Sequence, residues 1–428
     1  MVKASIFIIC LCTVGMTVCV TLENLFTKPY HNYGVMTKIL KGINDTLPHL
    51  VKLYSIGKSV RGRELWVLAI GYNMSGNMEL RPSVKYIGNM HGNEVVNREM
   101  LLMLSTHLID QYQSNSTIQK FLNTTVVHIM PSMNPDGYAK ALKGDCHGVI
   151  GRYNAAGIDL NRNFPDLWFN KSEKPIAKET RAVMDWLPQH NFVLSANLHG
   201  GAMVANYPFD TYKTEYRHSG SSVSPDDDTF RFLALTYSRS HANMAINQGR
   251  ECLGDYFPDG ISNGAAWYDM HGGMQDYNYL KHGIFELTLE ISCCKYPNAS
   301  EIEYYWIENR WALINLLMEV HRGVKGIVYD EDGNPVEGVE LAIKGRESVP
   351  FRSRNRGEYY RILMPGTYTI LVKYEGYASV SETFKVVNGE VTRLDIFLKR
   401  ETSEASKTVS IYNIPLIVPL LFSIMRVF

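Results

Sequence analysis

The chain has no excess of charge of either sign. Its 428 residues include 43 Lys and Arg against 43 Asp and Glu, so the formal net charge is zero at neutral pH. Basic residues are interspersed with acidic ones and form no patch of the kind that binds a nucleic-acid backbone or an anionic lipid surface. The composition therefore argues against a nucleic-acid partner, and any selectivity must come from local groups.

The sequence also lacks internal repeats, low-complexity segments and the pattern H-E-x-x-H. The last absence excludes the proteases that place two zinc-binding histidines one helical turn apart. Hydrophobic residues make up 45% of the chain, which is ample for packed cores. The length exceeds that of one typical domain.

Cysteine is scarce. Of the seven cysteines, three lie within residues 1–20, which leaves Cys146, Cys252, Cys293 and Cys294. Neighbouring cysteines are too constrained to bond each other easily. We therefore expect two disulfides that join Cys293 and Cys294 to Cys146 and Cys252, in either of two pairings.

Both ends of the chain carry apolar segments. Residues 1–20 combine an early lysine with a short uncharged apolar run, which predicts a secretory signal peptide. Residues 401–428 begin polar and end apolar, which predicts a glycosylphosphatidylinositol (GPI) attachment signal with Ser403 or Ser406 as the attachment site. The alternative is a transmembrane anchor, but two prolines and Arg426 would make an unusual span. We expect a protein on the outer face of the plasma membrane, or alternatively a secreted one.

Six Asn-x-Ser/Thr sequons agree with secretion, since only one or two would be expected by chance. Each has a residue other than proline in the middle. The candidate glycosylation sites are Asn44, Asn73, Asn115, Asn123, Asn170 and Asn298.

Residues 21–320 alternate apolar strands with helical patterns. This alternation predicts an α/β domain with a mixed central sheet flanked by helices. In such a sheet, chemistry collects where strands end and loops meet. The strands expected are 65–70, 84–87, 125–130, 192–198 and 284–291, and the helices include 98–112 and 178–187.

Residues 321–400 have a different style, with short strands separated by turn signals such as Asp332-Gly333-Asn334-Pro335. The pattern predicts a small all-β sandwich with antiparallel strands. This segment has no cluster of histidine, cysteine or carboxylate side chains, so we expect a structural appendage.

Three residues have the chemistry and placement of a metal site. His91 and Glu94 follow an apolar strand, and His199 ends another strand directly before two glycines. Two imidazoles and one carboxylate suit zinc and leave one position open for water. An H-x-x-E match alone is common, so the position of His199 carries the prediction; His128, in contrast, lies within a strand and is expected in the core.

Four longer motifs together resemble the M14 metallocarboxypeptidases of the N/E subfamily. The resemblance covers nearly the whole chain, because that subfamily places a transthyretin-like β domain after its catalytic domain. It implies a zinc-dependent exopeptidase with one Zn²⁺, held by His91, Glu94 and His199. The motifs are residues 131–137, 159–166, 195–201 and 287–297.

The resemblance also assigns roles around the metal. Glu290 corresponds to the general base, and Arg152 to the arginine that polarises the scissile carbonyl and stabilises its oxyanion. Asn161 and Arg162 correspond to the pair that holds the free carboxylate of the substrate. Tyr268 matches the tyrosine that closes over bound substrate.

Specificity is expected from Asp210, with Gln275 on the opposite wall of the pocket. A carboxylate in an enclosed pocket favours a cationic side chain, which predicts release of C-terminal Lys or Arg from peptides by a monomeric enzyme. One departure from the family pattern is Asn93, between the first two metal ligands, where an acid or an arginine is usual. The rival hypothesis is a non-catalytic binding protein of the same fold, but every residue whose loss defines such proteins is present.

Overall fold

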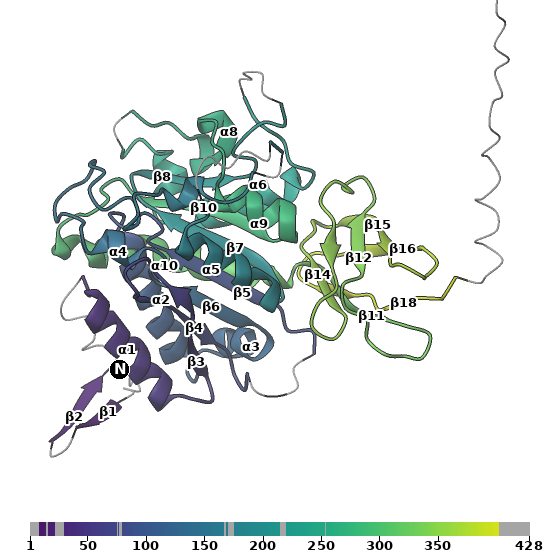
Figure 1. Ribbon diagram of the computed structural model, residues 1–428, viewed down its shortest axis with the longest axis horizontal. Helices are drawn as coiled ribbons and strands as arrows, with labels where there is room; N and C mark the ends of the chain where they lie inside the picture. The colour runs from purple at the N-terminus through teal and green to yellow at the C-terminus, as the bar shows by residue number, and fades with distance from the viewer. Residues whose placement is uncertain are drawn as a thin grey trace, which may run out of the picture.

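The computed structural model describes residues 8–13, 16–21, 30–74, 76, 79–166, 168–169, 175–214, 220–252 and 254–401. Asn170, Ser403 and Ser406 lie outside these residues, as do parts of both predicted terminal signals. At the N-terminus the described backbone forms an antiparallel pair, β1 (Ile8–Thr13) and β2 (Met16–Thr21). Two bodies follow, a large α/β domain and a smaller β domain beside it (Figure 1).

An eight-stranded mixed sheet forms the centre of the large domain. Its spatial order is β3-β4-β6-β5-β7-β10-β8-β9, and the four middle strands β6, β5, β7 and β10 run parallel. The strands are β3 (Val51–Lys58), β4 (Glu64–Ile70), β5 (Ser83–Gly88), β6 (Val126–Met130), β7 (Phe192–His199), β8 (Ala202–Tyr207), β9 (Ile261–Asn263) and β10 (Phe285–Ser292).

The central strands are buried on both faces. Every residue of β5, β7 and β10 is buried, which explains why these segments read as nearly continuous apolar runs. Strands that no helix covered on one side would instead alternate polar and apolar residues. The prediction of a mixed sheet between helical layers is confirmed.

Helices cover both faces of this sheet (Figure 1). The larger apolar core lies between the sheet and α1, α2, α3, α6 and α10, and a second core involves α5 and α9. No helix in the described parts of the chain is long and apolar enough to cross a membrane. The helices are α1 (Tyr33–Thr46), α2 (Val96–Gln111), α3 (Ser116–Thr124), α4 (Pro135–Tyr138), α5 (Lys178–Trp186), α6 (Asp227–Ser240), α7 (Met244–Asn247), α8 (Gly264–Trp267), α9 (Met274–His282) and α10 (Ile302–Met318).

The small domain packs two four-stranded sheets around its own apolar core. One sheet has the order β14-β11-β17 with β18 also on β11, and the other has the order β13-β12-β15-β16. The all-β sandwich is therefore confirmed. Its strands are β11 (Gly323–Tyr329), β12 (Glu340–Ile343), β13 (Phe351–Arg352), β14 (Glu358–Arg361), β15 (Gly366–Lys373), β16 (Val380–Val386), β17 (Val391–Arg393) and β18 (Ile396–Phe397).

The pairing of the last strands differs from the antiparallel pattern expected. The sequence reads as one strand over 391–397, but β17 and β18 are separate, and both run parallel to β11. The break has a local cause, because the Asp395 side chain accepts the backbone N–H of Ile327 at 3.0 Å. A side chain thus replaces one rung of the backbone ladder.

Candidate metal centre and substrate pocket

Three strand ends bring the predicted site residues together. In the parallel register, Gly88 at the end of β5 lies beside Leu198 of β7. In the next pair, Glu290 of β10 lies beside His199 of β7. Since β5, β7 and β10 point the same way, the segments that follow them meet at one edge of the sheet.

His91, Glu94 and His199 form the one group in the described chain with the donors to hold a metal ion, one ligand atom from each lying within 4.8 Å of the others. Glu94 Oε1 lies 2.9 Å from His91 Nδ1, and Glu94 Oε2 lies 2.9 Å from His199 Nδ1. All three side chains are buried. Two imidazole nitrogens and a carboxylate that converge in this way have the chemistry of a zinc site with an open position.

Asp159 completes the surroundings of this cluster. Its Oδ1 lies 3.0 Å from His91 Nε2, and its Oδ2 accepts Arg152 Nε at 3.0 Å. A carboxylate on the far nitrogen of an imidazole fixes the ring so that the other nitrogen faces a metal. Burial alone would raise the pKa of Asp159, but the contacts with His91 and Arg152 outweigh it and lower that pKa.

Glu290 lies in the same pocket as the cluster. It is 9% exposed, and no donor among the described residues reaches its Oε2. Burial raises the pKa of Glu290 well above its usual range, and the Glu94 charge adds to this effect. A free, desolvated carboxylate oxygen that faces a cavity is suited to accept and return a proton.

Arg152 and Asn161 line the pocket as well. Arg152 Nη1 lies 3.5 Å from Glu94 Oε1, which sets the guanidinium beside the metal ligands. Asn161 Oδ1 accepts the N–H of Met274 at 3.0 Å, and Arg162 Nη1 donates to the Asn161 carbonyl at 2.9 Å. The guanidinium of Arg162 lies 5.9 Å from the ring centre of Tyr268, itself a residue of the pocket lining.

Asp210 lies in the wall of the pocket and is 3% exposed. Its Oδ1 accepts Gln275 Nε2 at 2.9 Å, whereas no donor in the described chain reaches its Oδ2. Burial raises the pKa of Asp210 to about 7. Gly264 approaches closely here, because a Cβ on it would lie 2.0 Å from Asp210 Oδ1.

Gln275 does not lie on the opposite wall, where the sequence placed it. Its side chain is 1% exposed and lies behind Asp210, with Nε2 bound to Asp210 and Asn206 and Oε1 accepting the Thr288 N–H at 2.7 Å. The reason is its place in the first turn of α9, which packs against β10. Gln275 therefore supports Asp210 from behind and is not among the residues of the pocket lining.

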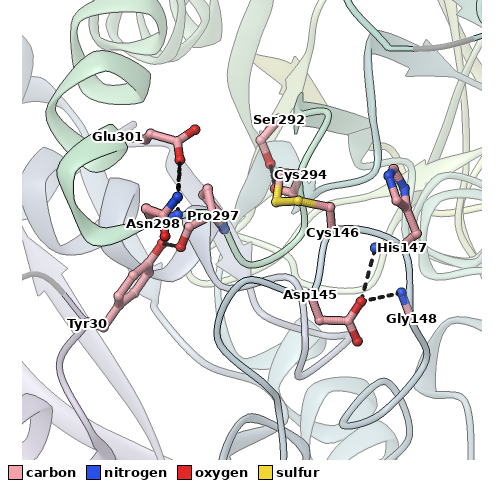
Figure 2. The surroundings of a disulfide bond; sticks show 10 residues. All are labelled: Tyr30, Asp145, Cys146, His147, Gly148, Ser292, Cys294, Pro297, Asn298 and Glu301. Atoms are coloured by element: carbon pink, nitrogen blue, oxygen red, sulfur yellow. Dashed lines mark hydrogen bonds between the residues drawn. A yellow bond between two sulfur atoms is a disulfide. The ribbon is translucent and has the colours of Figure 1, made fainter.

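The four cysteines form two disulfides, Cys146–Cys294 and Cys252–Cys293. They tie two distant loops to the two residues that directly follow β10. Figure 2 shows the first disulfide, next to a turn in which Asp145 Oδ1 accepts the Gly148 N–H at 2.7 Å. The loops that carry Cys146 and Cys252 are therefore held covalently to the segment that directly follows the strand carrying Glu290.

Three residues of the site, Asp159, Lys295 and Asp276, were not predicted from the sequence. Asp159 and Lys295 lie within two of the family motifs, and Lys295 lines the pocket, but the resemblance assigned no role to either residue. Asp276 follows Gln275, and its carboxylate accepts the Asp210 N–H at 3.0 Å. A helix-start acid such as Asp276 ordinarily lies on the surface, so only the packing of α9 reveals its contact.

Comparison with known proteins agrees with this geometry. The zinc carboxypeptidase family matches residues 36–312, and the carboxypeptidase regulatory-like domain matches residues 323–399. The chain belongs to the zinc carboxypeptidase family and is a metallocarboxypeptidase. Its relatives narrow this class to the N/E subfamily.

Among those relatives, carboxypeptidase M of Mus musculus is 45% identical over 355 residues, which cover 82% of this chain and 79% of that protein. The carboxypeptidase N catalytic chain of Rattus norvegicus is 43% identical over 405 residues, 88% of each chain. Carboxypeptidase A from Helicoverpa armigera has a similar solved structure, with a TM-score of 0.53 and 19% identity over 69% of this chain and 74% of that one. At that identity the structure supports the fold alone.

Proposed function

We propose that this metallocarboxypeptidase releases C-terminal Lys or Arg residues from extracellular peptides and proteins. One observation carries the proposal: the Asp210 carboxylate is buried in the pocket wall with Oδ2 free of any partner in the described chain. A buried charge without a partner is costly, and a cationic side chain from the substrate would remove that cost. An apolar side chain would leave it in place, so the pocket discriminates between the two.

One zinc ion held by His91, Glu94 and His199 fits the donor set and the Asp159 support described above. When bound, zinc supplies a Lewis acid that polarises the scissile carbonyl and makes water a stronger nucleophile at neutral pH. The remaining steps belong to side chains of this chain. Glu290 takes a proton from the attacking water and delivers it to the departing amine.

Residues of the pocket lining, with Arg162 beside the Tyr268 ring, hold the substrate. Arg152 donates to the carbonyl oxygen as negative charge develops on it. Asn161 and Arg162 bind the terminal carboxylate, for which the planar guanidinium offers paired hydrogen bonds. Tyr268, 45% exposed at the pocket mouth, is free to close over the bound residue.

We further propose a signal peptide over residues 1–20, a catalytic domain over 21–320, a β domain over 321–400 and a GPI signal over 401–428. The two disulfides support an oxidising compartment. Exposed sequon asparagines at Asn73, Asn123 and Asn298 are accessible to glycosylation, while Asn44 and Asn115 are half-buried. Release from cells by a phosphatidylinositol-specific phospholipase C would support the anchor, and recovery in the medium without treatment would support the secreted form.

A direct test of the activity uses purified protein and three peptides that end in Arg, Lys or Leu. We expect mass spectrometry to detect loss of the last residue from the first two peptides, and a zinc chelator to stop that loss. Equal cleavage of all three peptides would overturn the specificity, and no cleavage by zinc-loaded protein would overturn the activity. Size-exclusion chromatography of the same sample tests the proposal that the enzyme is a monomer.

A further inference from the structure

The two domains meet around one buried carboxylate, Asp226, which directly precedes α6. Tyr279 of α9 donates its hydroxyl to Asp226 Oδ2 at 2.5 Å. Two arginines of the β domain also bind Asp226: Arg361 through Oδ2, and Arg346 through Oδ1 at 2.7 Å. Asp226 and Arg361 are fully buried, so each depends on the other to offset its desolvation.

Arg361 also reaches the end of α9. Its Nη1 donates to the carbonyl of Gly283, the residue that ends this helix, at 3.4 Å. The guanidinium lies 4.9 Å from the ring centre of Phe285 and 5.9 Å from that of Tyr279. Gly283 has a φ of +68°, and a Cβ there would lie 3.0 Å from the Cβ of Phe351 in the β domain. The C-terminal end of α9 is thus packed directly against the small domain.

The other end of α9 supports the substrate pocket. Gln275 donates to Asp210 Oδ1 at 2.9 Å, and the Asp276 carboxylate accepts the Asp210 N–H at 3.0 Å. The helix has only nine residues, a length of about 13 Å. A short, hydrogen-bonded helix moves as a unit, so a displacement at Gly283 is transmitted to the groups that hold Asp210.

We propose that Arg361 of the β domain is a positioning residue for the specificity pocket, acting through α9 on Gln275 and Asp210. The inference rests on the proposed function, in which Asp210 selects Lys or Arg. It gives the β domain a part in substrate choice, although no β-domain residue lines the pocket in the described chain.

Arg346 provides the matched control. It binds the same Asp226 and also contacts Asp228 and the Tyr368 ring, and among the described residues it makes no hydrogen bond or ion pair with α9. If the arginines only held the domains together, neither Arg346→Met nor Arg361→Met would alter the discrimination between the peptides. If Arg361 positions the pocket, only its replacement alters discrimination.

The experiment measures kcat and KM of the full-length, zinc-loaded protein on peptides that end in Arg and in Leu. We expect Arg361→Met to raise KM for the Arg peptide about tenfold and to leave kcat/KM for the Leu peptide within about twofold, since a small displacement of positioning groups suffices for such losses. Arg361→Lys should recover part of the loss, because it keeps the charge but not the fork that spans Asp226 and Gly283. Arg346→Met should match the wild type on both peptides.

Tyr279→Phe is the variant for the case in which Arg361→Met fails to fold. It removes only the α9 hydroxyl that binds Asp226, and we expect a several-fold higher KM for the Arg peptide alone. Unchanged discrimination in Arg361→Lys and Tyr279→Phe, or an equal loss in Arg346→Met, overturns the inference. A wild-type enzyme without preference for Arg overturns the proposed function together with it, whereas a preference that Asp210→Ala abolishes and Arg361 variants leave intact overturns the inference alone.

Discussion

In the proposed function, substrate preference is decided at Asp210, because its buried carboxylate keeps one oxygen free for a cation in the described chain. No other side chain in the described part of the chain donates a hydrogen bond to that oxygen. Gln275 and Asp276 instead hold the Asp210 side chain and backbone from behind. Substitutions at Asp210 and Glu290 and a titration of Asp210 test the proposed roles of these single residues.

The first substitution removes the charge. We expect Asp210→Ala to lower kcat/KM on Arg-ended peptides by about 100-fold while it changes Leu-ended peptides far less, since a lost charge pair in an enclosed site costs several-fold more than a lost apolar contact. Steady-state kinetics measures kcat/KM on both peptides and hence the ratio of the Arg-ended to the Leu-ended value. Asp210→Asn, which keeps size and removes charge, is the control; if Asp210→Asn retained full preference for Arg, the charge would have no role.

The pH dependence follows from the raised pKa of Asp210, which is about 7 because of burial. Below that pH the free enzyme carries a neutral Asp210, so kcat/KM for Arg peptides falls as the pH is lowered through 7. Leu peptides do not need the charge and should lack this limb. A pH profile of the ratio of the two kcat/KM values isolates the effect, and a flat ratio from pH 5 to 9 would count against it.

The second substitution concerns the general base. Glu290→Gln should lower kcat by about 1,000-fold, because the amide can neither accept nor deliver the proton. Zinc content, measured by metal analysis, should stay at the wild-type level, since Glu290 is not a ligand. The control His199→Ala should lose both zinc and activity; a Glu290→Gln enzyme with near-normal turnover would refute the role.

A residue of this site is predictable from the sequence when its type and its place in a local pattern already indicate its role. His91, Glu94 and His199 were predicted from residue chemistry at strand ends, and the structure brings them together. Gln275 was expected on the wrong wall, because a motif gives neighbours along the chain and not the side from which a helix approaches. Asp159 was missed, since its two partners lie elsewhere in the sequence.

At the scale of elements, the parallel register of β7 and β10 places Glu290 beside His199. The buried strands were predictable because strands covered on both faces are apolar throughout. Strand β8 was not predicted, since it follows β7 after a two-residue turn and no separate composition marks it. The split between β17 and β18 depends on one contact of Asp395, which no periodicity reports.

The start of α8 offers an element-level test, because Gly264 lies against Asp210. We expect Gly264→Ala to lower the preference for Arg over Leu about tenfold, since the new methyl group would occupy space 2.0 Å from Asp210 Oδ1 and displace it. Peptide kinetics gives the ratio. Gly34→Ala is the matched control, because a methyl group there meets nothing closer than 3.5 Å; a Gly264→Ala enzyme as selective as Gly34→Ala would contradict the expected displacement.

At the scale of the whole molecule, a bound metal should stabilise the fold, since its ligands come from two segments, with Glu94 and His199 105 positions apart in the chain. Removal of zinc should cost about 3 kcal/mol when free zinc had exceeded its dissociation constant 100- to 1,000-fold. Thermal unfolding with and without a chelator measures this cost as a lower Tm. The same chelator should leave the Tm of His199→Ala unchanged, and a wild-type Tm insensitive to it would contradict the linkage.

The two domains were predictable because alternating strands and helices give way to short strands separated by turns. The contact between the two domains was not predictable. Asp226, Arg346 and Arg361 are ordinary charged residues in sequence, and over 100 positions separate the acid from each arginine. Only their burial where the domains meet makes Asp226 the shared ion-pair partner of the two arginines. Contacts of this kind depend on how the folded domains pack together, and local sequence patterns do not predict them.

The neighbouring cysteines after β10 have a consequence for where the protein can work. Cys293 and Cys294 lead in two directions, to Cys252 and to Cys146. In a thiol-rich cytosol both disulfides would be reduced. Both loops would then be released from the segment that follows the strand bearing Glu290, although the metal-binding residues would be unchanged. Reducing conditions would therefore remove two covalent ties next to the strand that carries Glu290.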